Sequence, residues 1–405
     1  MIDLAYISPL NPIASGLSDY SEMLVPALAE HARITLYSDC GTPSNQEIAD
    51  RFTVRPIAHL ARHRSQHDLR LYQFGNSPDH RNAFDAFRRM PGVVTLHEPF
   101  LHHGFYGMSE AYYYRETYYD GVSARGRVKF LIQRLIEDDR DELRQVLCIG
   151  RLIDASLGLV VHSQTARRII DQYHQARAPH SRRSGVAVAV IPQSMPVAEM
   201  SRPREHRAEF GLPADALIFG VAGTVHPSKE PHLVIEAFAR VAAEQPDARL
   251  VFIGDLLPDS DLPALIRDLN VADRVTFFER LEPLERMHRA IAACDVIINL
   301  RRPTIGETSA TALRALALGR PLIVRDVGWY GELPDVACSK ISPDAGLEEL
   351  ARAITELGRS AARREQMGQT GRAFAQAECN PATVARCYAE FLEDVRDRLS
   401  RRAEP

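Results

Sequence analysis

A repeated alternation between short apolar runs and longer segments of helical periodicity constrains this chain more than any other feature. The apolar runs of the N-terminal half are Leu4–Ile7, Ile34–Tyr37, Leu69–Phe74, Val93–Leu96 and Leu159–Val161. Those of the C-terminal half are Leu217–Val221, Leu250–Ile253, Val275–Phe278, Val296–Leu300 and Leu322–Val324. Strands buried on both faces read as continuous apolar runs, and parallel strands need crossover helices between them. Each half therefore predicts a parallel sheet covered by helices, which is an α/β fold.

The length and the proline pattern predict where this fold divides. A chain of 405 residues suits two domains of about 200 residues each better than one core. Pro192, Pro196 and Pro203 interrupt the periodicity between the two halves and mark the join. We expect an N-terminal Rossmann-like domain over residues 1–197 and a C-terminal Rossmann-like domain over residues 198–379.

Residues 380–405 carry the pattern of an amphipathic helix. Apolar residues recur there at i, i+3, i+4 and i+7, namely Val384, Cys387, Tyr388, Phe391, Leu392, Val395 and Leu399. Arginines gather toward its end, at Arg396, Arg398, Arg401 and Arg402. The pattern favours a helix that packs one face on a domain, and a helix lying on a membrane surface is the alternative.

Two segments depart from the alternation. A helix over Ser18–Glu30 would contain Pro26, so we expect it to kink or restart at that residue. Residues 101–157 form a long insertion with a tyrosine cluster, Tyr112, Tyr113, Tyr114, Tyr118 and Tyr119. These tyrosines are expected to line a pocket, to pack, or to lie on the surface, and the sequence leaves the three roles open.

The composition excludes several classes of partner and site. A net charge of −4 gives no reason to expect nucleic acid as an electrostatic partner. The six cysteines form no Cys-x-x-Cys pair, so we expect reduced thiols rather than a disulfide framework or a zinc ribbon. The chain begins without a signal-peptide pattern, and no apolar run approaches the ~20 residues that span a bilayer. We expect a cytoplasmic protein, and association with the cytoplasmic face of a membrane stays open.

Two turns follow predicted strands and precede predicted helices. Gly16 lies in the turn after the first strand, and Thr224 and Lys229 lie in Gly223-Thr-Val-His-Pro-Ser-Lys after the strand at 217–221. Such a turn brings backbone N–H groups toward an anion, and a lysine beside it neutralises phosphate. Neither turn matches Gly-x-Gly-x-x-Gly or the P-loop pattern, so dinucleotide and P-loop functions lose support. The alternatives are a plain turn at Gly16 and a solvated Lys229.

A histidine-rich stretch, Val94-Thr-Leu-His-Glu-Pro-Phe-Leu-His-His, follows another predicted strand. A metalloprotease helix needs two histidines at i and i+4, whereas His97 and His102 are five apart with Pro99 between them. What remains is His97 with Glu98 at the carboxyl end of a strand, where open α/β sheets place ligands. A structural histidine is the alternative.

The most informative stretch is Asn299-Leu-Arg-Arg-Pro-Thr-Ile-Gly-Glu-Thr-Ser-Ala, which runs on to Gly319 and Pro321. A strand ends in two arginines, a turn carries a carboxylate at Glu307, and Thr308 or Ser309 caps the next helix, predicted over Ser309–Leu318. This arrangement offers helix N–H groups for phosphate beside a carboxylate for sugar hydroxyls. The alternative is an ordinary capped turn in which Glu307 serves as a first-turn partner of the helix dipole.

Carboxylate pairs give no convincing metal site. Asp139 and Asp141 lie in a charged run, and Asp259 and Asp261 lie in a polar loop, so we expect both pairs to be solvated. We therefore expect no bound metal.

Taken together, these stretches resemble glycosyltransferase family 4, retaining enzymes of the GT-B architecture. The likeness is clearest across residues 215–335 and in Tyr72-Gln-Phe-Gly-Asn-Ser-Pro running on to Val94-Thr-Leu-His. The resemblance implies two Rossmann-like parallel-sheet domains with a cleft between them, and a C-terminal helix that crosses back to the first domain.

The resemblance also implies roles for individual residues. His97 matches the family's His-Asp element near the donor sugar, with Glu98 in place of the Asp, and Glu307 is similar to the first glutamate of the Glu-x7-Glu motif. Lys229 matches the lysine that grips the diphosphate, and Arg280 falls where the family contacts the base. The full implied donor-binding set is Gly16, Thr224, Lys229, Arg280, Arg301, Arg302, Gly306, Thr308, Ser309 and Arg314.

Three departures from the family pattern leave the nucleotide open. Thr224 stands where an arginine normally accompanies the phosphate lysine, and Arg314 stands where the second motif glutamate holds the ribose. Counting back eight positions from Arg314 gives Gly306, so Glu307 fills the first position only with a one-residue gap. The arginine pair that precedes this turn is the expected substitute for the missing phosphate cation.

The resemblance implies a retaining, metal-independent glycosyltransferase, without a cofactor, that moves a sugar from a nucleotide-diphosphate sugar to an acceptor hydroxyl in surface polysaccharide or glycoconjugate synthesis. The implied partners are that donor and a sugar or lipid-linked acceptor, and peripheral contact with the inner membrane face stays open. Two alternatives remain: a sugar-nucleotide epimerase of the same fold, and a non-catalytic nucleotide-sugar-binding protein, which Thr224 and Arg314 favour.

Overall fold

The computed structural model describes residues 1–121, 147–177, 186–197, 202–258 and 260–403. The chain divides into two compact units, each with its own core. Unit 1 comprises Met1–Ser194, Ile305–Thr308 and Pro381–Pro405, and unit 2 comprises Met195–Thr304 and Ser309–Asn380. The expected join at 197/198 compares with a division at 194/195, and residues 198–201 lie outside the described part of the chain.

Unit 1 is built on a seven-stranded parallel sheet in the order β3-β2-β1-β4-β5-β6-β7. Its strands are β1 (Ile2–Ile7), β2 (Ala32–Tyr37), β3 (Thr53–Arg55), β4 (Leu69–Phe74), β5 (Val93–Leu96), β6 (Gly158–Val161) and β7 (Val188–Val190). The apolar runs predicted five of these strands. They did not include the two edge strands of three residues each: β3 contains polar Thr53 and Arg55, whereas β7 is apolar but short.

Helices cover both faces of this sheet. They are α1 (Gly16–Leu28), α2 (Gln46–Arg51), α3 (Arg81–Arg89), α4 (His102–Met108), α5 (Glu110–Tyr119), α7 (Gly150–Ala155), α8 (Gln164–Arg177) and α16 (Pro381–Ala403), with short 3-10 segments at Ile57–Gln66 and Pro78–His80. Successive strand residues point to opposite faces, so Leu4 and Tyr6 pack with α1 and α16, whereas Ala5 and Ile7 pack with α3 and α7. The result is a doubly wound unit.

Helix α1 runs through Pro26, so the expected restart is wrong. The helix spans Gly16–Leu28 as one element, and Pro26 lies in its last turn. A proline there removes one intrahelical bond, the one to the Glu22 carbonyl, at a point where the helix is about to end. At the other end Ser15 is the N-cap, and its hydroxyl accepts bonds from the backbone N–H groups of residues 17 and 18.

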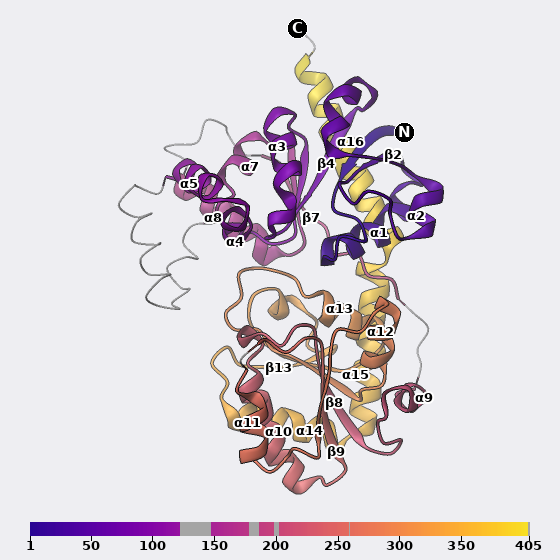
Figure 1. The fold of residues 1–405 in the computed structure, drawn as a ribbon, viewed down its shortest axis with the longest axis vertical. Helices are drawn as coiled ribbons and strands as arrows, with labels where there is room; N and C mark the ends of the chain where they lie inside the picture. The colour runs from indigo at the N-terminus through magenta and orange to yellow at the C-terminus, as the bar shows by residue number, and fades with distance from the viewer. Residues whose placement is uncertain (122–146, 178–185, 198–201, 259, 404–405) are drawn as a thin grey trace. The chain divides into compact units, whose positions relative to one another are not determined.

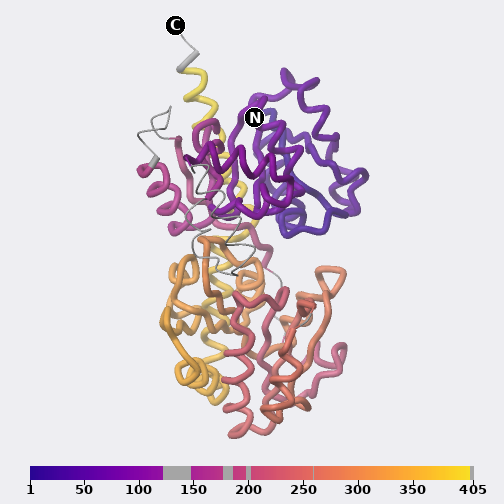
Figure 2. The backbone as a smooth tube through the Cα atoms, turned by 60° about the vertical axis from the view of Figure 1, so that its left-hand side comes forward, coloured from indigo at the N-terminus to yellow at the C-terminus, as the bar shows by residue number. Residues whose placement is uncertain are grey.

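The C-terminal helix α16 returns to unit 1, as the sequence predicted. Two views show it in yellow beside the indigo and purple elements of unit 1, with α1 among its neighbours (Figures 1 and 2). Its buried face includes Val384, Tyr388 and Leu392. The Tyr388 hydroxyl lies 2.9 Å from the Tyr20 hydroxyl on α1 and 3.1 Å from Oγ1 of Thr95 on β5. These fully buried polar contacts fix the helix at one position on the sheet.

Unit 2 is built on a six-stranded parallel sheet in the order β10-β9-β8-β11-β12-β13. Its strands are β8 (Leu217–Ala222), β9 (Ala248–Ile253), β10 (Val275–Phe278), β11 (Val296–Asn299), β12 (Leu322–Arg325) and β13 (Cys338–Ile341). The apolar runs predicted the first five. The edge strand β13 was not predicted because its two central residues, Ser339 and Lys340, are polar and only partly buried.

The helices of unit 2 also lie on both faces of their sheet. They are α9 (Arg204–Arg207), α10 (Pro231–Glu244), α11 (Leu262–Asp268), α12 (Leu284–Ala292), α13 (Ala310–Ala317), α14 (Leu347–Arg359) and α15 (Ala361–Phe374), with 3-10 segments at Ala208–Phe210, Pro227–Lys229 and Gly328–Glu332 and a π segment at Ala375–Cys379. Helices α10 and α14 share one apolar cluster with the strands, and α12 and α13 share the other. This is the two-layered covering that the alternation predicted.

The described part of the 101–157 insertion is helical and its tyrosines serve packing and surface roles. Tyr113 is buried, Tyr118 is exposed, and the Tyr119 hydroxyl donates to Asp154 at 2.9 Å. The buried Glu116 pairs with arginines at 115 and 151 and holds α5 in place. Residues 122–146, which include the Asp139-Arg-Asp141 stretch, lie outside the described residues.

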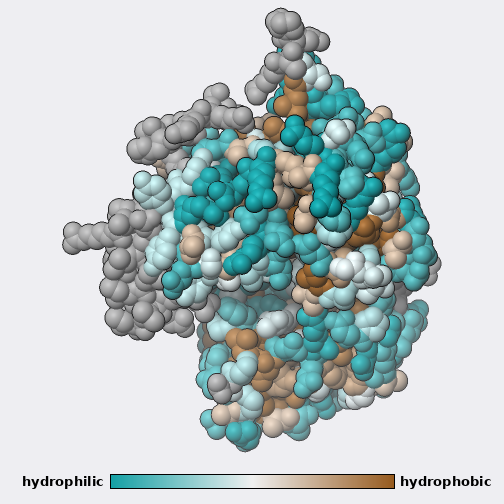
Figure 3. Space-filling model, turned by 45° about the horizontal axis from the view of Figure 1, so that its top comes forward, coloured by the Kyte–Doolittle hydropathy of each residue, from teal (hydrophilic) through white to brown (hydrophobic). Residues whose placement is uncertain are grey.

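Among the described residues, no helix is both long and apolar enough to span a membrane. On the face that Figure 3 shows, hydrophobic atoms form small patches among hydrophilic ones.

We predict that Tyr388→Phe destabilises unit 1 by about 1–3 kcal/mol, because it removes the hydroxyl that joins α16 to Tyr20 and Thr95 in a buried setting. Calorimetric unfolding would measure the change. Arg398→Gln, on the exposed face of the same helix, is the control and should stay within about 0.5 kcal/mol. Equal effects of the two changes would show that the hydroxyl contributes nothing.

Candidate functional site

The order of strands places a topological switch point in each unit. In unit 2 the chain runs outward from β8 to β9 and β10, and then returns to the other side of β8 to form β11. In unit 1 the same change of direction falls between β1 and β4. Loops that leave the carboxyl ends of the strands at such a point diverge and form a crevice in which open α/β sheets bind ligands. The loops after β8 and β11 carry most of the predicted donor-binding residues.

The loop after β8 brings a glycine turn and the amine of a lysine side chain into contact. Gly223 has a positive φ of 86°, and Lys229 ends the 3-10 segment that follows. The Nζ of Lys229 donates to the carbonyl oxygen of Ala222 at 2.6 Å. A Cβ at position 223 would lie 2.5 Å from this Nζ. Only glycine therefore gives the turn its conformation and leaves room for the amine.

The loop after β11 is bonded to the loop after β8. The Arg301 guanidinium donates to Oγ of Ser228 at 2.7 Å, and the backbone N–H of Arg302 donates to the carbonyl oxygen of Ser228 at 2.8 Å. Lys229 and Arg301 are therefore held as neighbours. Burial of the amine, together with the positive charge of Arg301, lowers the pKa of Lys229 to about 7. A buried cation of this kind is stabilised by an arriving anion.

A polar cluster fixes the start of helix α13. Ser309 is the N-cap, and its Oγ accepts from the backbone N–H of Ala312 at 3.2 Å. Asn299, the last residue of β11, receives bonds at Oδ1 from Ser309 at 3.3 Å and from the Tyr330 hydroxyl at 3.0 Å. The Nδ2 of Asn299 donates to Thr311 at 2.8 Å. The predicted cap at Ser309 is thus present and tied to the end of the strand.

Three other predicted residues of unit 2 take separate positions. Thr224 directly follows the Gly223 turn. Arg280 is exposed, and it pairs with Glu282 at 2.6 Å while its backbone N–H donates to Asp255 after β9. Arg314 is buried within α13, where its charge helps to lower the pKa of His288 on α12 to about 4, after the effect of burial. Thr224 alone of the three lies in the loop that holds Lys229.

The segment Ile305–Thr308 belongs to unit 1 by its contacts. Gly306 has a positive φ of 89°, and a Cβ there would lie 2.6 Å from Cδ1 of Ile169. The Thr308 hydroxyl donates to Oε1 of Gln193 at 2.8 Å. Gly306 is therefore required both for its backbone conformation and for close packing.

Glu307 does not serve as a first-turn partner of the helix dipole. The helix begins at Ala310 after its cap at Ser309, and its first turn contains no acidic residue. Oε2 of Glu307 instead accepts the backbone N–H of Ile305 at 2.8 Å. The carboxylate thus shapes its own turn.

His97 is part of a chain of buried polar groups in unit 1. The Nδ1 of His97 lies 3.1 Å from Nε2 of His162, whose Nδ1 lies 2.8 Å from the carbonyl oxygen of Ile191. On the other side, Nε2 of His97 lies 2.9 Å from Oε1 of the Gln73 side-chain amide. Burial lowers the pKa of His162 to about 4 and the pKa of His97 well below its usual value, so both rings are neutral near pH 7.

This chain has one consistent assignment of protons. A carbonyl only accepts, so His162 carries its proton on Nδ1 and accepts at Nε2. His97 must then carry its proton on Nδ1 and accept at Nε2. That acceptor requires the oxygen and nitrogen of the Gln73 amide to be exchanged, so that the NH2 group faces Nε2 of His97, and the exchange also gives this otherwise unpartnered buried group a bond. His97 is thereby fixed as one neutral tautomer.

The remaining predicted residue of unit 1, Gly16, is the first residue of α1. Tyr20, one turn further along α1, packs edge-on against the His97 ring with the ring centroids 4.6 Å apart. The unit-1 switch point therefore brings α1 next to the His97 chain.

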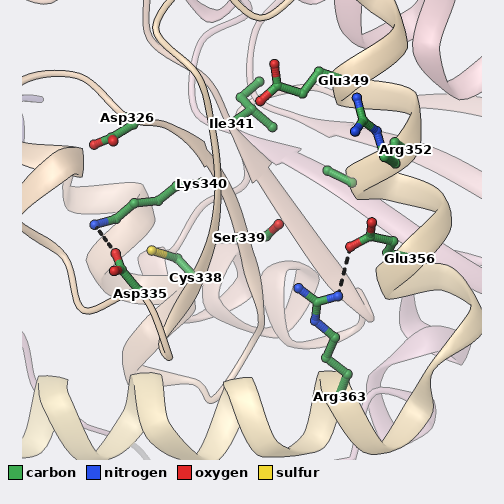
Figure 4. A pocket seen from close by; sticks show the side chains of 11 residues that line it. Asp326, Asp335, Cys338, Ser339, Lys340, Ile341, Glu349, Arg352, Glu356 and Arg363 are labelled. Atoms are coloured by element: carbon green, nitrogen blue, oxygen red, sulfur yellow. Dashed lines mark hydrogen bonds and ion pairs between the residues drawn. The ribbon is translucent and has the colours of Figure 1, made fainter.

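No cluster of three or more histidine, cysteine or carboxylate side chains suited to a metal occurs among the described residues. A separate cavity of about 490 Å³ lies between β13, α14 and α15. Figure 4 shows that charged pairs line it, with Lys340 bonded to Asp335 and Arg363 bonded to Glu356. It contains none of the residues that the sequence predicted for the site.

Two comparisons of sequence find glycosyltransferases similar to part of this chain. Residues 203–374 match the family model of the glycosyl transferases group 1. A D-inositol 3-phosphate glycosyltransferase of Stackebrandtia nassauensis is 36% identical over 132 residues, which are 30% of this chain and 29% of the relative. One of the same name from Segniliparus rotundus is 27% identical over 272 residues, 65% of this chain and 58% of the relative. The matched part of this chain is therefore similar to glycosyl transferases of group 1.

A comparison of structures agrees with this family on the fold. Anabaena Alr3699/HepE, solved in complex with UDP-glucose, has a TM-score of 0.67 at 16% identity, with 97% of this chain and 100% of that chain covered. Both units therefore have the Rossmann-like form of GT-B glycosyltransferases. The aligned part of this chain spans less than two thirds of the length of the curated relatives named here.

Sequence reasoning missed several residues of this site. His162 follows the predicted strand at 159–161 just as His97 follows its own strand, so the same signal would have found it. Ser228 accepts hydrogen bonds from the side chain of Arg301 and the backbone of Arg302 and so joins the two loops. Apart from its position in the turn, nothing in the sequence marks this residue. Gln73 stands inside a strand, where a polar residue in an apolar run marks a buried partner.

We predict that the affinity for a nucleoside diphosphate falls as the pH rises above 7, by up to about tenfold per pH unit. An amine of pKa about 7 takes up a proton when phosphate binds above that pH, whereas below it the amine is already charged. Calorimetry between pH 7.5 and 9, where phosphate with a pKa of about 6 is already ionised, would measure the slope. The Lys229→Met variant should bind weakly without this slope, and an equal slope in the variant would contradict the assignment.

Proposed function

We propose that this chain is a retaining glycosyltransferase that transfers a sugar from a nucleotide-diphosphate sugar to an acceptor hydroxyl. The observation that carries the proposal is the buried amine of Lys229, held against Gly223 and beside Arg301 at the switch point of unit 2. A diphosphate would bring negative charge to this pair of cations. The match of residues 203–374 to the glycosyl transferases group 1 supports the same assignment.

The chemistry we propose depends on positive charges and N–H donors that already face the leaving diphosphate. As a diphosphate leaves the sugar, negative charge develops on its oxygens, and preorganised donors that face it lower the barrier. Lys229 and Arg301 would supply cations, and the N-terminal turn of α13 would supply backbone N–H groups. The leaving phosphate would accept the proton of the acceptor hydroxyl. No metal ion and no covalent enzyme intermediate take part in this scheme.

Glu307 and His97 have distinct proposed roles. Glu307 uses one carboxylate oxygen on its own turn, and we assign the carboxylate to the hydroxyls of the donor sugar. His97 is neutral, with both ring nitrogens bonded within the protein, so we assign it a fixed position near the sugar rather than the work of a general base. Arg280, at the end of β10, is the proposed contact to the base.

The comparisons guide the choice of substrates. The protein of the structural comparison was solved with UDP-glucose, so a UDP-sugar is the first donor to test. The two curated relatives are named for an inositol phosphate acceptor, which favours a polyhydroxylated acceptor. We propose a sugar or lipid-linked acceptor, with work at the cytoplasmic face of a membrane.

A non-catalytic nucleotide-sugar-binding protein is the second candidate. Arg314, which stands at the position of the second motif glutamate, is buried inside α13. That burial favours a structural use of this position, which leaves ribose binding to other residues.

We predict that one member of a UDP-, GDP-, ADP- and dTDP-sugar set raises the melting temperature and supports transfer with retained anomeric configuration. Nuclear magnetic resonance of the first product would read the anomer, and the rate should be unchanged in EDTA. An inverted product, or activity restored only by Mg²⁺ or Mn²⁺, would overturn the mechanism. Binding without transfer would favour the second candidate, and conversion of the donor to an epimer would identify an epimerase.

We predict that Glu307→Gln lowers turnover at least about tenfold while the affinity for the nucleoside diphosphate changes less, because bonds to an ionised acceptor are stronger than neutral ones. The amide keeps the shape of the side chain. Its Oε1 can still accept the N–H of Ile305, so the turn should persist. A variant with full activity would remove Glu307 from the site.

A further inference from the structure

Glu230, the residue after Lys229, has a backbone conformation that is unusual for its type. Its φ is 52° and its ψ is 48°, in the left-handed region, and it occupies the cap position before α10 without a capping bond from its side chain. Residues with a Cβ adopt this conformation only where the surroundings hold them in it. Something in unit 2 must therefore hold the peptide that joins Lys229 to helix α10.

An ion pair with Arg325 holds Glu230. The Arg325 Nε donates to Oε2 of Glu230 at 2.9 Å, and its Nη2 donates to Oε1 at 2.7 Å, so both carboxylate oxygens meet the guanidinium fork. Such two-point pairing fixes the geometry as well as the distance. Arg325 is the last residue of β12 and is fully buried.

The other donors of Arg325 are also used. Its Nη1 donates to the carbonyl oxygens of Ser342 at 3.1 Å and Pro343 at 2.8 Å, and both Nη groups lie 3.1 Å from the carbonyl oxygen of Ala345. The guanidinium is thus fully satisfied and cannot shift without losing several bonds. It ties the Lys229 turn to the carboxyl end of β12 and to the loop that follows β13.

Resting on the proposed function, we infer that Glu230 and Arg325 are positioning residues for Lys229. They hold the backbone after Lys229 in the left-handed conformation and thereby present its amine to the diphosphate. Neither residue touches the ligand. Burial and Arg301 are the causes that lower the pKa of Lys229, which fits a Glu230 that acts through the backbone rather than through charge on the amine.

Two double variants separate this role from a purely structural one. Glu230→Ala/Arg325→Gln and Glu230→Gly/Arg325→Gln both lack the ion pair, and they differ only in the Cβ at position 230. Glycine adopts the left-handed conformation freely. The measured quantity is the ratio of the dissociation constants of uridine and UDP, since this ratio isolates the phosphate contacts.

We expect the alanine double variant to lose roughly fivefold to thirtyfold in this ratio, and the glycine double variant to recover most of it. Arg207→Gln is the control, because Arg207 is equally buried and pairs with Asp295 at 2.6 Å beside the amino end of β11. It should lower the melting temperature and leave the ratio unchanged.

Equal ratios in the two double variants would overturn the inference, whether both match the wild type or both fall. If the alanine double variant does not fold, Glu230→Gln serves in its place, since it keeps the Cβ and weakens the pair, and an unchanged ratio there would also overturn it. A wild type that prefers neither UDP nor another nucleoside diphosphate over its nucleoside would instead remove the proposed function. The two failures are therefore distinguishable.

Discussion

The buried amine of Lys229 is the constraint on which the rest of unit 2 depends. A cation out of water is costly unless neighbouring dipoles and charges compensate it. Here one backbone carbonyl accepts from it, while a nearby arginine opposes it and lowers its pKa to about 7. The glycine turn, the bonded loops and the left-handed Glu230 all serve to keep the amine in this place. The charged amine in such an arrangement is stabilised most when an anion binds beside it.

Unit 1 has a different constraint, because neutral polar groups are buried in its core and are held in place by hydrogen bonds. The chain from Ile191 through His162 and His97 to Gln73 has one proton arrangement, because a carbonyl at its end can only accept. Tyr20 packs against His97, and its hydroxyl meets Tyr388 of the returning helix α16. The last helix of the chain thus supports the residue that sequence reasoning placed nearest the sugar.

Much of the fold could be predicted from the sequence because hydrophobic periodicity reports burial directly. Ten strands were predicted from apolar runs, among them the edge strand β10. The edge strands β3, β7 and β13 were not predicted: β3 and β13 contain polar residues, and β7 is a short apolar strand of three residues that the prediction left out. The expected restart at Pro26 was wrong because a proline in the last turn of a helix removes only one intrahelical hydrogen bond. Local chemistry predicted a cap at Thr308 or Ser309, and the structure has it at Ser309.

The site was less predictable where it depends on distant pairs. Lys229 and Arg301 could be predicted as neighbours because the carboxyl ends of parallel strands meet at one edge. Arg325 pairs with Glu230 across 95 positions of sequence, and no local pattern marks either residue. Glu307 showed the limit of local chemistry, because the sequence left a helix-dipole role open as the alternative to sugar binding, while its carboxylate accepts the backbone N–H of its own turn.

The most direct test of the role of Lys229 is a crystal structure of the protein with the nucleoside diphosphate that stabilises it most. We expect the terminal phosphate about 3 Å from Nζ of Lys229, at the carboxyl ends of β8 and β11 and beside the Gly223 turn. Phosphates bound elsewhere, for instance in the charged cavity beside β13, with Lys229 still bonded to the Ala222 carbonyl, would contradict it.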